Sequence, residues 1–204
     1  MSKKPIIVFE GIEGSGKTFH INCVSKYLTK KKISHIIIRE PGGSDNSEKI
    51  RNLILNNKSN FNKNTDLLLY LASRSENIKF LKKYYKKKII LIDRFVDSTI
   101  AYQHYGMQID LRIIKNINKY LLKNFIVDFT FLNIVNSENM KKRLNQRRKL
   151  NRYDKFNINF YKKVQNGYLK IAQTNKKKYE IVDSNLKIEV NKKVILEKII
   201  SLIK

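Results

Sequence analysis

The stretch Phe9-Glu10-Gly11-Ile12-Glu13-Gly14-Ser15-Gly16-Lys17-Thr18 decides the fold of this chain. It follows the apolar residues 5–9 and precedes a segment with helical spacing, which is the strand-loop-helix setting of a G-x-x-x-x-G-K-[ST] motif. The four fixed positions of that motif are filled by Gly11, Gly16, Lys17 and Thr18. The alternative is a strand-to-helix turn that uses its glycines only for steric reasons, and the complete motif in this setting disfavours it. The stretch therefore predicts a loop that binds the phosphates of a nucleotide.

The chemistry of this loop follows from its residue types. Small residues at positions 14–16 let backbone N–H groups turn inward, and the next helix directs the positive end of its dipole to the same point. Lys17 adds a positive charge, and the hydroxyl of Thr18 is a ligand for Mg²⁺. We therefore expect a nucleotide triphosphate to contact the whole loop, namely Gly11, Ile12, Glu13, Gly14, Ser15, Gly16, Lys17 and Thr18.

The chain has the length of a single α/β domain. About 100 to 200 residues per domain is usual, so the 204 residues predict one domain over residues 1–204. No apolar segment approaches the roughly 20 residues of a membrane-spanning helix, and residues 1–9 lack the apolar region of a signal peptide. Cys23 is the only cysteine, which excludes an internal disulfide and fits a reducing compartment. We expect a cytoplasmic protein that does not bind a membrane.

The chain is strongly basic. Lys and Arg number 43 against 17 Asp and Glu, which gives a formal net charge of +26. A basic face can bind nucleic acid through its phosphates, but the lysines recur at the ends of many predicted elements and form no single stripe or tail. We therefore expect no nucleic-acid partner and interpret most lysines as solvated surface. The sparse arginines are better candidates for phosphate contacts, because a planar guanidinium can bind phosphate with two hydrogen bonds.

Short apolar runs alternate with longer segments of helical spacing along the whole chain. The apolar runs are rich in β-branched residues and lie at residues 5–9, 34–39, 88–92, 128–135 and 179–182. The helical spacing covers residues 17–31, 47–56, 65–87, 110–123, 137–148, 156–178 and 189–203. This alternation predicts an α/β fold with a five-stranded parallel sheet and helices on both faces. Together with the motif at residues 11–18, it indicates the fold of the phosphate-loop NTPases.

Polar residues follow the ends of several of these runs. In an open parallel sheet the ligand lies at the carboxyl ends of the strands, so we expect these residues to share one rim. Asp93-Arg94-Phe95 follows the third run and Asp183-Ser184-Asn185 the fifth. Asp93 is expected to orient Mg²⁺ opposite Thr18, although a helix N-cap is its alternative role. Ser184 is expected on the nucleotide side of the rim.

Three further motifs make the chain resemble a known family. They are Arg39-Glu40-Pro41-Gly42-Gly43, the pattern D-R-x-x-D-S-x-x-A-Y-Q at residues 93–103, and Arg152-Tyr153-Asp154. In this order and spacing they are similar to the thymidylate kinases, and the resemblance covers essentially the whole chain. It implies Mg²⁺-dependent transfer of the γ-phosphate of ATP to dTMP, for dTTP synthesis, on a fold of the nucleoside monophosphate kinase type. It also implies a homodimer.

The resemblance implies roles for residues that surround the acceptor base. Tyr70 holds the position of the aromatic residue that stacks on thymine, and Arg74 that of the arginine that reaches the acceptor nucleotide. Tyr102 resembles the residue that lies against the sugar, while Thr99 and Gln103 match positions that line the base pocket. Without the motifs, a core aromatic beside a surface arginine would be the preferred interpretation of Tyr70 and Arg74.

A second group of residues is implied to act on the phosphates. Arg94 looks like the arginine that clamps the acceptor phosphate, and Arg39 and Glu40 are similar to the pair beside that phosphate. Glu13 resembles the loop acid that positions the substrate. We therefore expect Lys17, Arg94 and Glu13 to take part in catalysis. For Arg39 and Glu40, the alternative is an ordinary surface pair of little energetic consequence.

Arginines also cluster between two of the predicted helices. Four of them lie in the segment around residues 143–157, where related kinases carry a mobile lid: Arg143, Arg147, Arg148 and Arg152. In the family a basic lid compensates for a phosphate loop without arginine, and this loop has Glu-Gly-Ser at its centre. The resemblance implies that Arg147 and Arg148 are catalytic, that Arg143 and Arg147 bind ATP, and that Asp154 contacts the active site. A solvated basic helix end is the alternative.

The sequence also departs from the family and leaves other functions to be weighed. Asn151 replaces an acidic residue, and Met107-Gln108 stands where an arginine is frequent, so lid and acceptor contacts are expected to differ in detail. The nearest alternative is a kinase for another nucleoside monophosphate or a deoxynucleoside. A regulatory GTPase would need Asn-Lys-x-Asp, which neither residues 62–65 nor residues 175–178 supply. A third alternative is a basic nucleic-acid-binding protein with a vestigial nucleotide site.

Overall fold

A computed structural model describes residues 4–204 and contains one parallel sheet. Its strands run in the spatial order β2-β3-β1-β4-β5, with every neighbouring pair parallel. The strands are β1 (Ile6–Glu10), β2 (His35–Arg39), β3 (Ile89–Asp93), β4 (Phe129–Ile134) and β5 (Tyr179–Asp183). The predicted five-stranded α/β fold is confirmed, and each strand lies within one residue of its predicted run at both ends.

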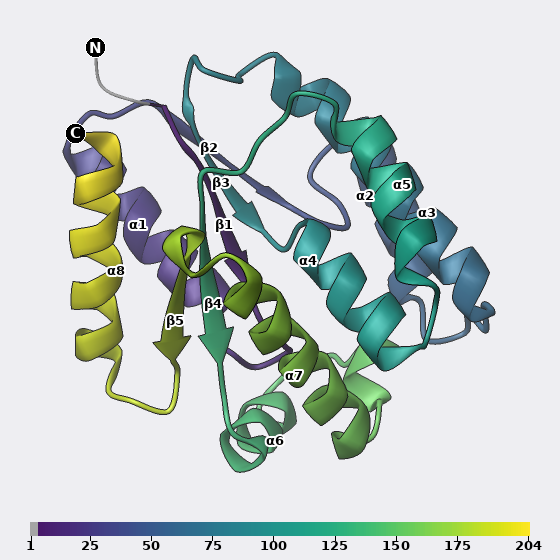
Figure 1. The fold of residues 1–204 in the computed structure, drawn as a ribbon. Helices are drawn as coiled ribbons and strands as arrows, with labels where there is room; N and C mark the ends of the chain where they lie inside the picture. The colour runs from purple at the N-terminus through teal and green to yellow at the C-terminus, as the bar shows by residue number, and fades with distance from the viewer. Residues whose placement is uncertain (1–3) are drawn as a thin grey trace.

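Helices cover both faces of the sheet (Figure 1). Helix α1 (Lys17–Lys30) and helix α8 (Ile188–Ile203) lie on one face, and most of the other helices lie on the opposite face. The remaining helices are α2 (Asp45–Leu55), α3 (Lys63–Lys82), α4 (Val96–Thr99), α5 (Leu111–Leu122), α6 (Ser137–Asn145) and α7 (Ile158–Thr174). Short helical turns add the π-helix η1 (Ile100–Gly106) and the 3₁₀ turns η2 (Tyr153–Lys155) and η3 (Lys176–Lys178).

The core consists of two apolar layers separated by the sheet. Side chains of Ile7 and Phe9 point from β1 toward α1 and α8, where Ile199 is fully buried. Ile6 and Val8 point from the same strand to the other face and pack with residues of α3. This burial on both sides explains why the central strands read as continuous apolar runs in the sequence.

Several predicted helices end earlier than their spacing indicated. Helix α6 stops at Asn145, so Arg147 and Arg148 lie in the following loop and not on the helix predicted for residues 137–148. Helix α3 stops at Lys82. On that helix Leu68 is 59% exposed and points away from the core.

The helical segment formed by α4 and η1 was absent from the predicted helices. It follows β3 directly and packs against α7. Three consecutive residues, Ala101, Tyr102 and Gln103, are all buried there. Because an ordinary amphipathic helix buries every third or fourth residue, such a run does not produce the helical spacing that predicts a surface helix. Wide π-turns of this kind are frequent at functional sites.

The topology brings four loops to one edge of the sheet. Strand β1 pairs with β3 on one side and with β4 on the other, and the chain leaves β1 toward the phosphate loop. The segments after β2, β3 and β5 leave the sheet at the same edge because all strands are parallel. In this arrangement the ligand site lies outside the carboxyl ends of the strands. Among residues 4–204, no helix has the length and apolarity required to cross a membrane.

Candidate active site

The phosphate loop has a backbone that only its glycines permit. Gly11 has φ of 139°, and a Cβ atom there would lie 2.2 Å from the carbonyl oxygen of Asn133. Gly16 has φ of 83° and begins helix α1 without a side-chain cap. The first N–H groups of α1 therefore remain available to an anion. Ser15 is buried, and its carbonyl oxygen accepts a hydrogen bond from Ser184 Oγ at 2.7 Å.

Lys17 lies folded against the loop. Its Nζ donates hydrogen bonds to the carbonyl oxygens of Gly11 and Ile12, both at 2.9 Å. Burial, together with the nearby charge of Arg94, lowers the pKa of Lys17 to about 8. A bound phosphate would favour the charged amine, because an opposite charge within a few ångströms stabilises the ionised form. The amine is thus placed where phosphate oxygens would satisfy it.

A pair of oxygen ligands lies beside this amine. Thr18 Oγ1 donates to Asp93 Oδ2 at 3.1 Å, so the loop hydroxyl and the carboxylate at the end of β3 meet as predicted. Magnesium prefers oxygen ligands and is usually held by one or two protein groups together with water and substrate phosphates. No group of three or more His, Cys, Asp or Glu residues capable of holding a metal occurs within residues 4–204. The two groups are of the kind that magnesium prefers as ligands.

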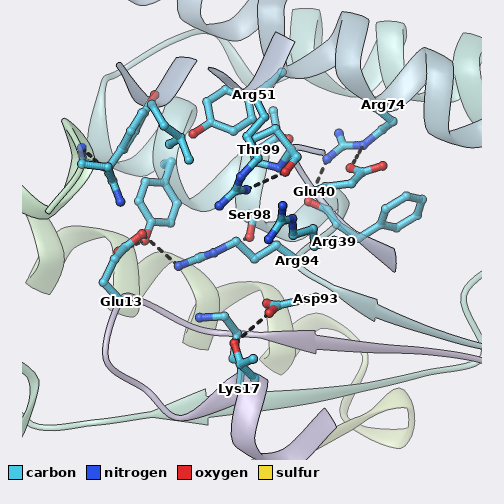
Figure 2. A pocket seen from close by; sticks show the side chains of 18 of the residues that line it. Glu13, Lys17, Arg39, Glu40, Arg51, Arg74, Asp93, Arg94, Ser98 and Thr99 are labelled. Carbon is cyan, nitrogen blue, oxygen red and sulfur yellow. Dashed lines mark hydrogen bonds and ion pairs between the residues drawn. The ribbon is translucent and has the colours of Figure 1, made fainter. Parts of the chain in front are cut away.

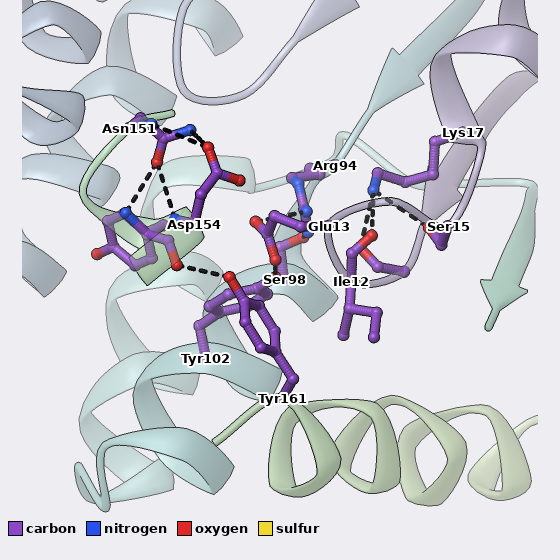
Figure 3. A network of polar contacts seen from close by, with 12 residues as sticks. Ile12, Glu13, Ser15, Lys17, Arg94, Ser98, Tyr102, Asn151, Asp154 and Tyr161 are labelled. Atoms are coloured by element: carbon purple, nitrogen blue, oxygen red, sulfur yellow. Dashed lines mark hydrogen bonds and ion pairs between the residues drawn. The ribbon is translucent and has the colours of Figure 1, made fainter. Parts of the chain in front are cut away.

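Arg94 is at the centre of the site (Figure 3). Its Nη2 donates to Glu13 Oε1 at 2.9 Å, and its guanidinium lies 5.2 Å from the centre of the Tyr102 ring. Nη1 donates to the hydroxyls of Tyr168 at 3.1 Å and Ser98 at 3.4 Å. Burial disfavours its charge, but Tyr102 and Glu13 outweigh burial and raise the pKa of Arg94. The guanidinium therefore stays charged at every physiological pH.

Glu13 joins the loop to Arg94 and to Tyr102. The Tyr102 hydroxyl donates to the second oxygen of the Glu13 carboxylate. Burial opposes ionisation of Glu13, but Arg94 and Lys17 together outweigh burial and lower its pKa. The carboxylate is therefore ionised and orients the arginine and the tyrosine on either side of it.

A cavity of about 250 Å³ opens around these groups (Figure 2). Most of the residues expected to bind nucleotide or metal line it: Glu13, Lys17, Thr18, Arg39, Glu40, Tyr70, Arg74, Asp93, Arg94, Thr99, Tyr102, Gln103 and Arg147. The other nine expected residues do not line it: Gly11, Ile12, Gly14, Ser15, Gly16, Arg143, Arg148, Asp154 and Ser184. The sheet edge therefore gathers residues from segments that are far apart in the sequence.

Aromatic rings enclose the end of the cavity away from Lys17. The rings of Tyr70 and Tyr102 each pack edge-on against Tyr153, at centroid distances of 5.9 and 6.1 Å. Thr99 Oγ1 and Gln103 Nε2 are buried at this end without a hydrogen-bond partner among residues 4–204. Buried polar groups are rarely left unpaired, so these two atoms mark a place for a polar ligand.

Two neighbouring residues at the end of β2, Arg39 and Glu40, take part in separate ion pairs. Glu40 is buried and accepts a hydrogen bond from Arg74 Nε at 2.8 Å. The two other terminal nitrogens of Arg74 donate to Asn118 Oδ1 and to the carbonyl of Phe95. Arg39 is exposed and pairs with Glu48 instead, at 3.0 Å. Arg74 therefore holds Glu40 in position in the lining of the cavity, while Arg39 lies at the exposed edge of the cavity.

The lid segment is connected to both ends of the site. Arg147 Nη1 donates to Asp154 Oδ1 at 2.6 Å, and the side chain of Asp154 also accepts from Asn151. Arg143 donates to the carbonyl oxygens of Gly14 and Ser184, so it links the phosphate loop to the segment after β5. Arg148 is exposed. Of the two arginines expected to be catalytic in this segment, only Arg147 reaches the cavity.

Comparison with known proteins now decides the family. The family model described as "Thymidylate kinase" matches residues 9–195. The chain belongs to the thymidylate kinase family. A thymidylate kinase of Mycoplasma capricolum subsp. capricolum is 38% identical over 95% of this chain and 95% of its own. One of Carboxydothermus hydrogenoformans is 37% identical over 90% of both chains.

A solved structure agrees with this assignment. The crystal structure of thymidylate kinase from Ehrlichia chaffeensis matches with a TM-score of 0.77 and 31% sequence identity, covering 98% of each chain. Thymidylate kinases are nucleoside monophosphate kinases, so the chain is a phosphotransferase with the phosphate-loop fold of that class. The resemblance seen in the sequence motifs is confirmed.

Some residues of this thymidylate kinase site were missed in the sequence. Arg51 lines the cavity from α2, and its Nη1 donates to the Pro41 carbonyl at 2.6 Å. It could have been found among the sparse arginines, but no motif surrounds it. Ser98 and Tyr153 line the cavity and lie inside motifs quoted above, yet their types alone indicated no role. Tyr168 contacts Arg94 from α7, a helix that carries no motif.

Proposed function

We propose that this chain transfers the γ-phosphate of ATP to dTMP, giving dTDP and ADP for dTTP synthesis. One observation carries the proposal: a single cavity is lined by the phosphate-loop residues Lys17 and Thr18 and by the aromatic Tyr70, with Arg94 between them. A site for transfer between two nucleotides needs these two ends and a charge at their junction. The family assignment supports the same reaction.

The donor end is the phosphate loop. Its backbone N–H groups and Lys17 are suited to bind the ATP phosphates, and we assign donor binding to the loop residues 11–18. Arg143 and Ser184 support this end indirectly, because both contact the backbone of the loop. Mg²⁺, when bound, supplies charge neutralisation of the transferring phosphate, and Thr18 and Asp93 would hold it.

The acceptor end is the aromatic part of the cavity. We assign Tyr70 to stacking on the thymine base and Tyr102 to the sugar. The unpaired Thr99 Oγ1 and Gln103 Nε2 offer hydrogen bonds to the polar edge of a pyrimidine. Discrimination against dUMP then depends on one methyl group, which is worth about 1 to 3 kcal/mol.

The acceptor phosphate would lie between the two ends. We assign its binding to Arg94, with Arg39 at the rim and the Glu40–Arg74 pair shaping the floor. The attacking phosphate oxygen is already ionised at neutral pH, so the reaction requires no general base. Arg94 and Lys17 stabilise charge on the transferring group, and Glu13 keeps Arg94 oriented.

We propose a lid at residues 143–157 that closes over the donor phosphates. Arg147 already lines the cavity and is oriented by Asp154. Arg148 could turn inward from its exposed position, and both arginines would add positive charge to a loop that has no arginine of its own. A closed lid would also exclude water, which competes with dTMP for the phosphoryl group.

The wider organisation follows the family. We propose one catalytic domain over residues 1–204, acting in the cytoplasm as a homodimer. Large apolar side chains are exposed on α2, α3 and α5, which supports an interface on that side: Leu53, Leu68, Ile113 and Tyr120. Exposed apolar groups that cluster commonly mark interaction surfaces.

A substrate panel tests the proposed function. ADP release from ATP is measured with dTMP, dUMP, UMP, CMP, AMP and thymidine as acceptors at equal concentration. We expect dTMP to give the highest kcat/KM, with detectable turnover of dUMP. A preference for any other acceptor would contradict the assignment of the pocket, and retention on DNA without turnover would favour a nucleic-acid-binding protein.

A further inference from the structure

Glu10 is a buried carboxylate that the proposed reaction does not use. It is the last residue of β1, directly before the phosphate loop, and is only 1% exposed. Its Oε1 accepts hydrogen bonds from the backbone N–H groups of Phe95 at 2.8 Å and Ser98 at 3.2 Å. Its Oε2 accepts from the hydroxyls of Ser98 at 2.6 Å and Tyr168 at 3.2 Å. Both oxygens are therefore occupied by groups that surround Arg94.

The backbone contacts of Glu10 fix an unfavourable turn. Arg94 has φ of 67°, in the left-handed region that residues with a Cβ atom seldom occupy. Such a conformation is unfavourable and persists only where the surroundings enforce it. Phe95 and Ser98 follow Arg94 immediately and after one turn, so their bonds to Oε1 hold the chain in this conformation.

The side-chain contacts of Glu10 fix the direction of two hydroxyls. The hydroxyls of Ser98 and Tyr168 lie 2.6 Å apart, and both accept from Arg94 Nη1. Each hydroxyl has one proton, and a carboxylate can only accept. Because Glu10 accepts from the hydroxyls, their protons point away from Arg94. The lone pairs of the hydroxyl oxygens then face its guanidinium.

We propose that Glu10 is a positioning residue for Arg94. It acts through the backbone that follows Arg94 and through the hydroxyls of Ser98 and Tyr168, without touching either nucleotide. Burial raises the pKa of Glu10, and the hydrogen bonds from Ser98 and the charge of Arg94 counteract that increase. The inference rests on the proposed function in one respect, because it takes Arg94 as the group that stabilises the transferring phosphate.

The substitution Glu10→Gln tests this role because it keeps the shape of the side chain. An amide has only one acceptor oxygen. If that oxygen faces the hydroxyls, the amide N–H₂ opposes the backbone N–H groups of Phe95 and Ser98. If it faces the backbone, a hydroxyl proton loses its acceptor beside the charged guanidinium. Either orientation disturbs the placement of Arg94.

We expect Glu10→Gln to lower kcat for dTMP phosphorylation about 10- to 100-fold, since misplacement by about 1 Å can cost 10²-fold in rate. The KM for ATP should change less than about threefold, because the donor loop keeps its own contacts. Glu197→Gln, the same change at an exposed position of α8, is the matched control and should leave both constants unchanged. Activity is measured well below the midpoint of thermal unfolding of each variant.

Tyr168→Phe provides an independent test that removes only one hydroxyl. It should lower kcat severalfold, and the double variant with Glu10→Gln should be less impaired than the product of the two single effects, because both act on Arg94. A Glu10→Gln or Tyr168→Phe enzyme with wild-type kcat would overturn the inference, as would strictly multiplicative effects. If Glu10→Gln does not fold, the kcat of Tyr168→Phe decides. Absence of dTMP phosphorylation by the wild-type protein would instead overturn the proposed function, which distinguishes the two failures.

Discussion

At the scale of single residues, Arg94 is held in place from several sides. An ion pair with Glu13, two hydroxyls and the face of Tyr102 surround its guanidinium. A charge that is oriented before the substrate arrives stabilises a transition state without reorganisation at the moment of reaction. The cost of this arrangement is a left-handed backbone at Arg94, which the neighbouring residues must enforce.

Tyr70→Ala is expected to raise the KM for dTMP much more than the KM for ATP. The ring lines the acceptor end of the cavity and packs against Tyr153. Loss of aromatic stacking on a base costs about 1 to 3 kcal/mol, which corresponds to roughly 5- to 150-fold in KM. Steady-state kinetics with each nucleotide varied in turn measures both constants. A rise confined to the KM for ATP would place the base elsewhere.

Many of the motif residues that line the cavity were predicted from the sequence, and most of the residues that support them were not. Lys17, Thr18 and Asp93 meet as expected, because the motif and the topology together specify their positions. Glu10 and Tyr168 have no local signal, since their function depends on the packing of β1 against α4 and of α7 against both. Long-range contacts of this kind produce no local pattern in a single sequence.

At the scale of elements, the η2 turn connects the two ends of the site. Tyr153 packs against the aromatic rings of the acceptor end, and the next residue, Asp154, pairs with the lid residue Arg147. Arg152 anchors the same turn to α3 through Asp66. A nucleotide that orders the tyrosines would therefore also restrict the lid.

Neutralising Arg147 and Arg148 together is expected to lower kcat at least tenfold, because the loop has no arginine of its own and removal of one preorganised donor commonly costs 10²- to 10³-fold. The KM for dTMP should change less. Lys149→Ala removes an exposed positive charge next to them and serves as the control. Wild-type kinetics in the double variant would mean that both arginines belong to a solvated basic surface.

The elements of the sheet were predicted well, while one helical segment was missed. The central strands β1, β3 and β4 are short apolar runs buried on both faces, so composition and length reveal them directly. The edge strands β2 and β5 are partly exposed but are equally short and rich in β-branched residues. The segment α4–η1 buries the consecutive residues Ala101, Tyr102 and Gln103, and polar residues in such a run conceal its helical character. It is also the segment that supplies the polar lining of the acceptor end.

At the scale of the whole molecule, the half-buried carboxyl of Asp97 lies near Glu10 and is expected to affect stability. Burial, together with the charge of Glu10, raises the pKa of Asp97 to about 7. The usual pKa of an aspartate is 3.8. Between these values the folded protein retains a proton that the unfolded chain has released, so this carboxyl makes the free energy of unfolding fall as pH rises.

Asp97→Asn is expected to remove this decrease in the free energy of unfolding between pH 4 and pH 7. The amide oxygen can still accept the hydrogen bond from the Tyr179 hydroxyl, which is 2.7 Å from Asp97 Oδ2. Above pH 7 the variant should be more stable than the wild type by on the order of 1 kcal/mol or more, and the two should converge toward pH 4. Urea unfolding at pH 5, 6 and 8 measures the difference. Parallel pH dependence of both proteins would show that Asp97 ionises normally in the folded state.

The central claim is that one cavity transfers phosphate between two nucleotides. The most direct measurement is the amount of dTDP formed for each ADP released when the wild-type protein is mixed with Mg²⁺, ATP and dTMP. We predict one dTDP per ADP, and almost no ADP when dTMP is omitted. Release of ADP without a matching amount of dTDP would mean that water receives the phosphoryl group, and it would contradict the account.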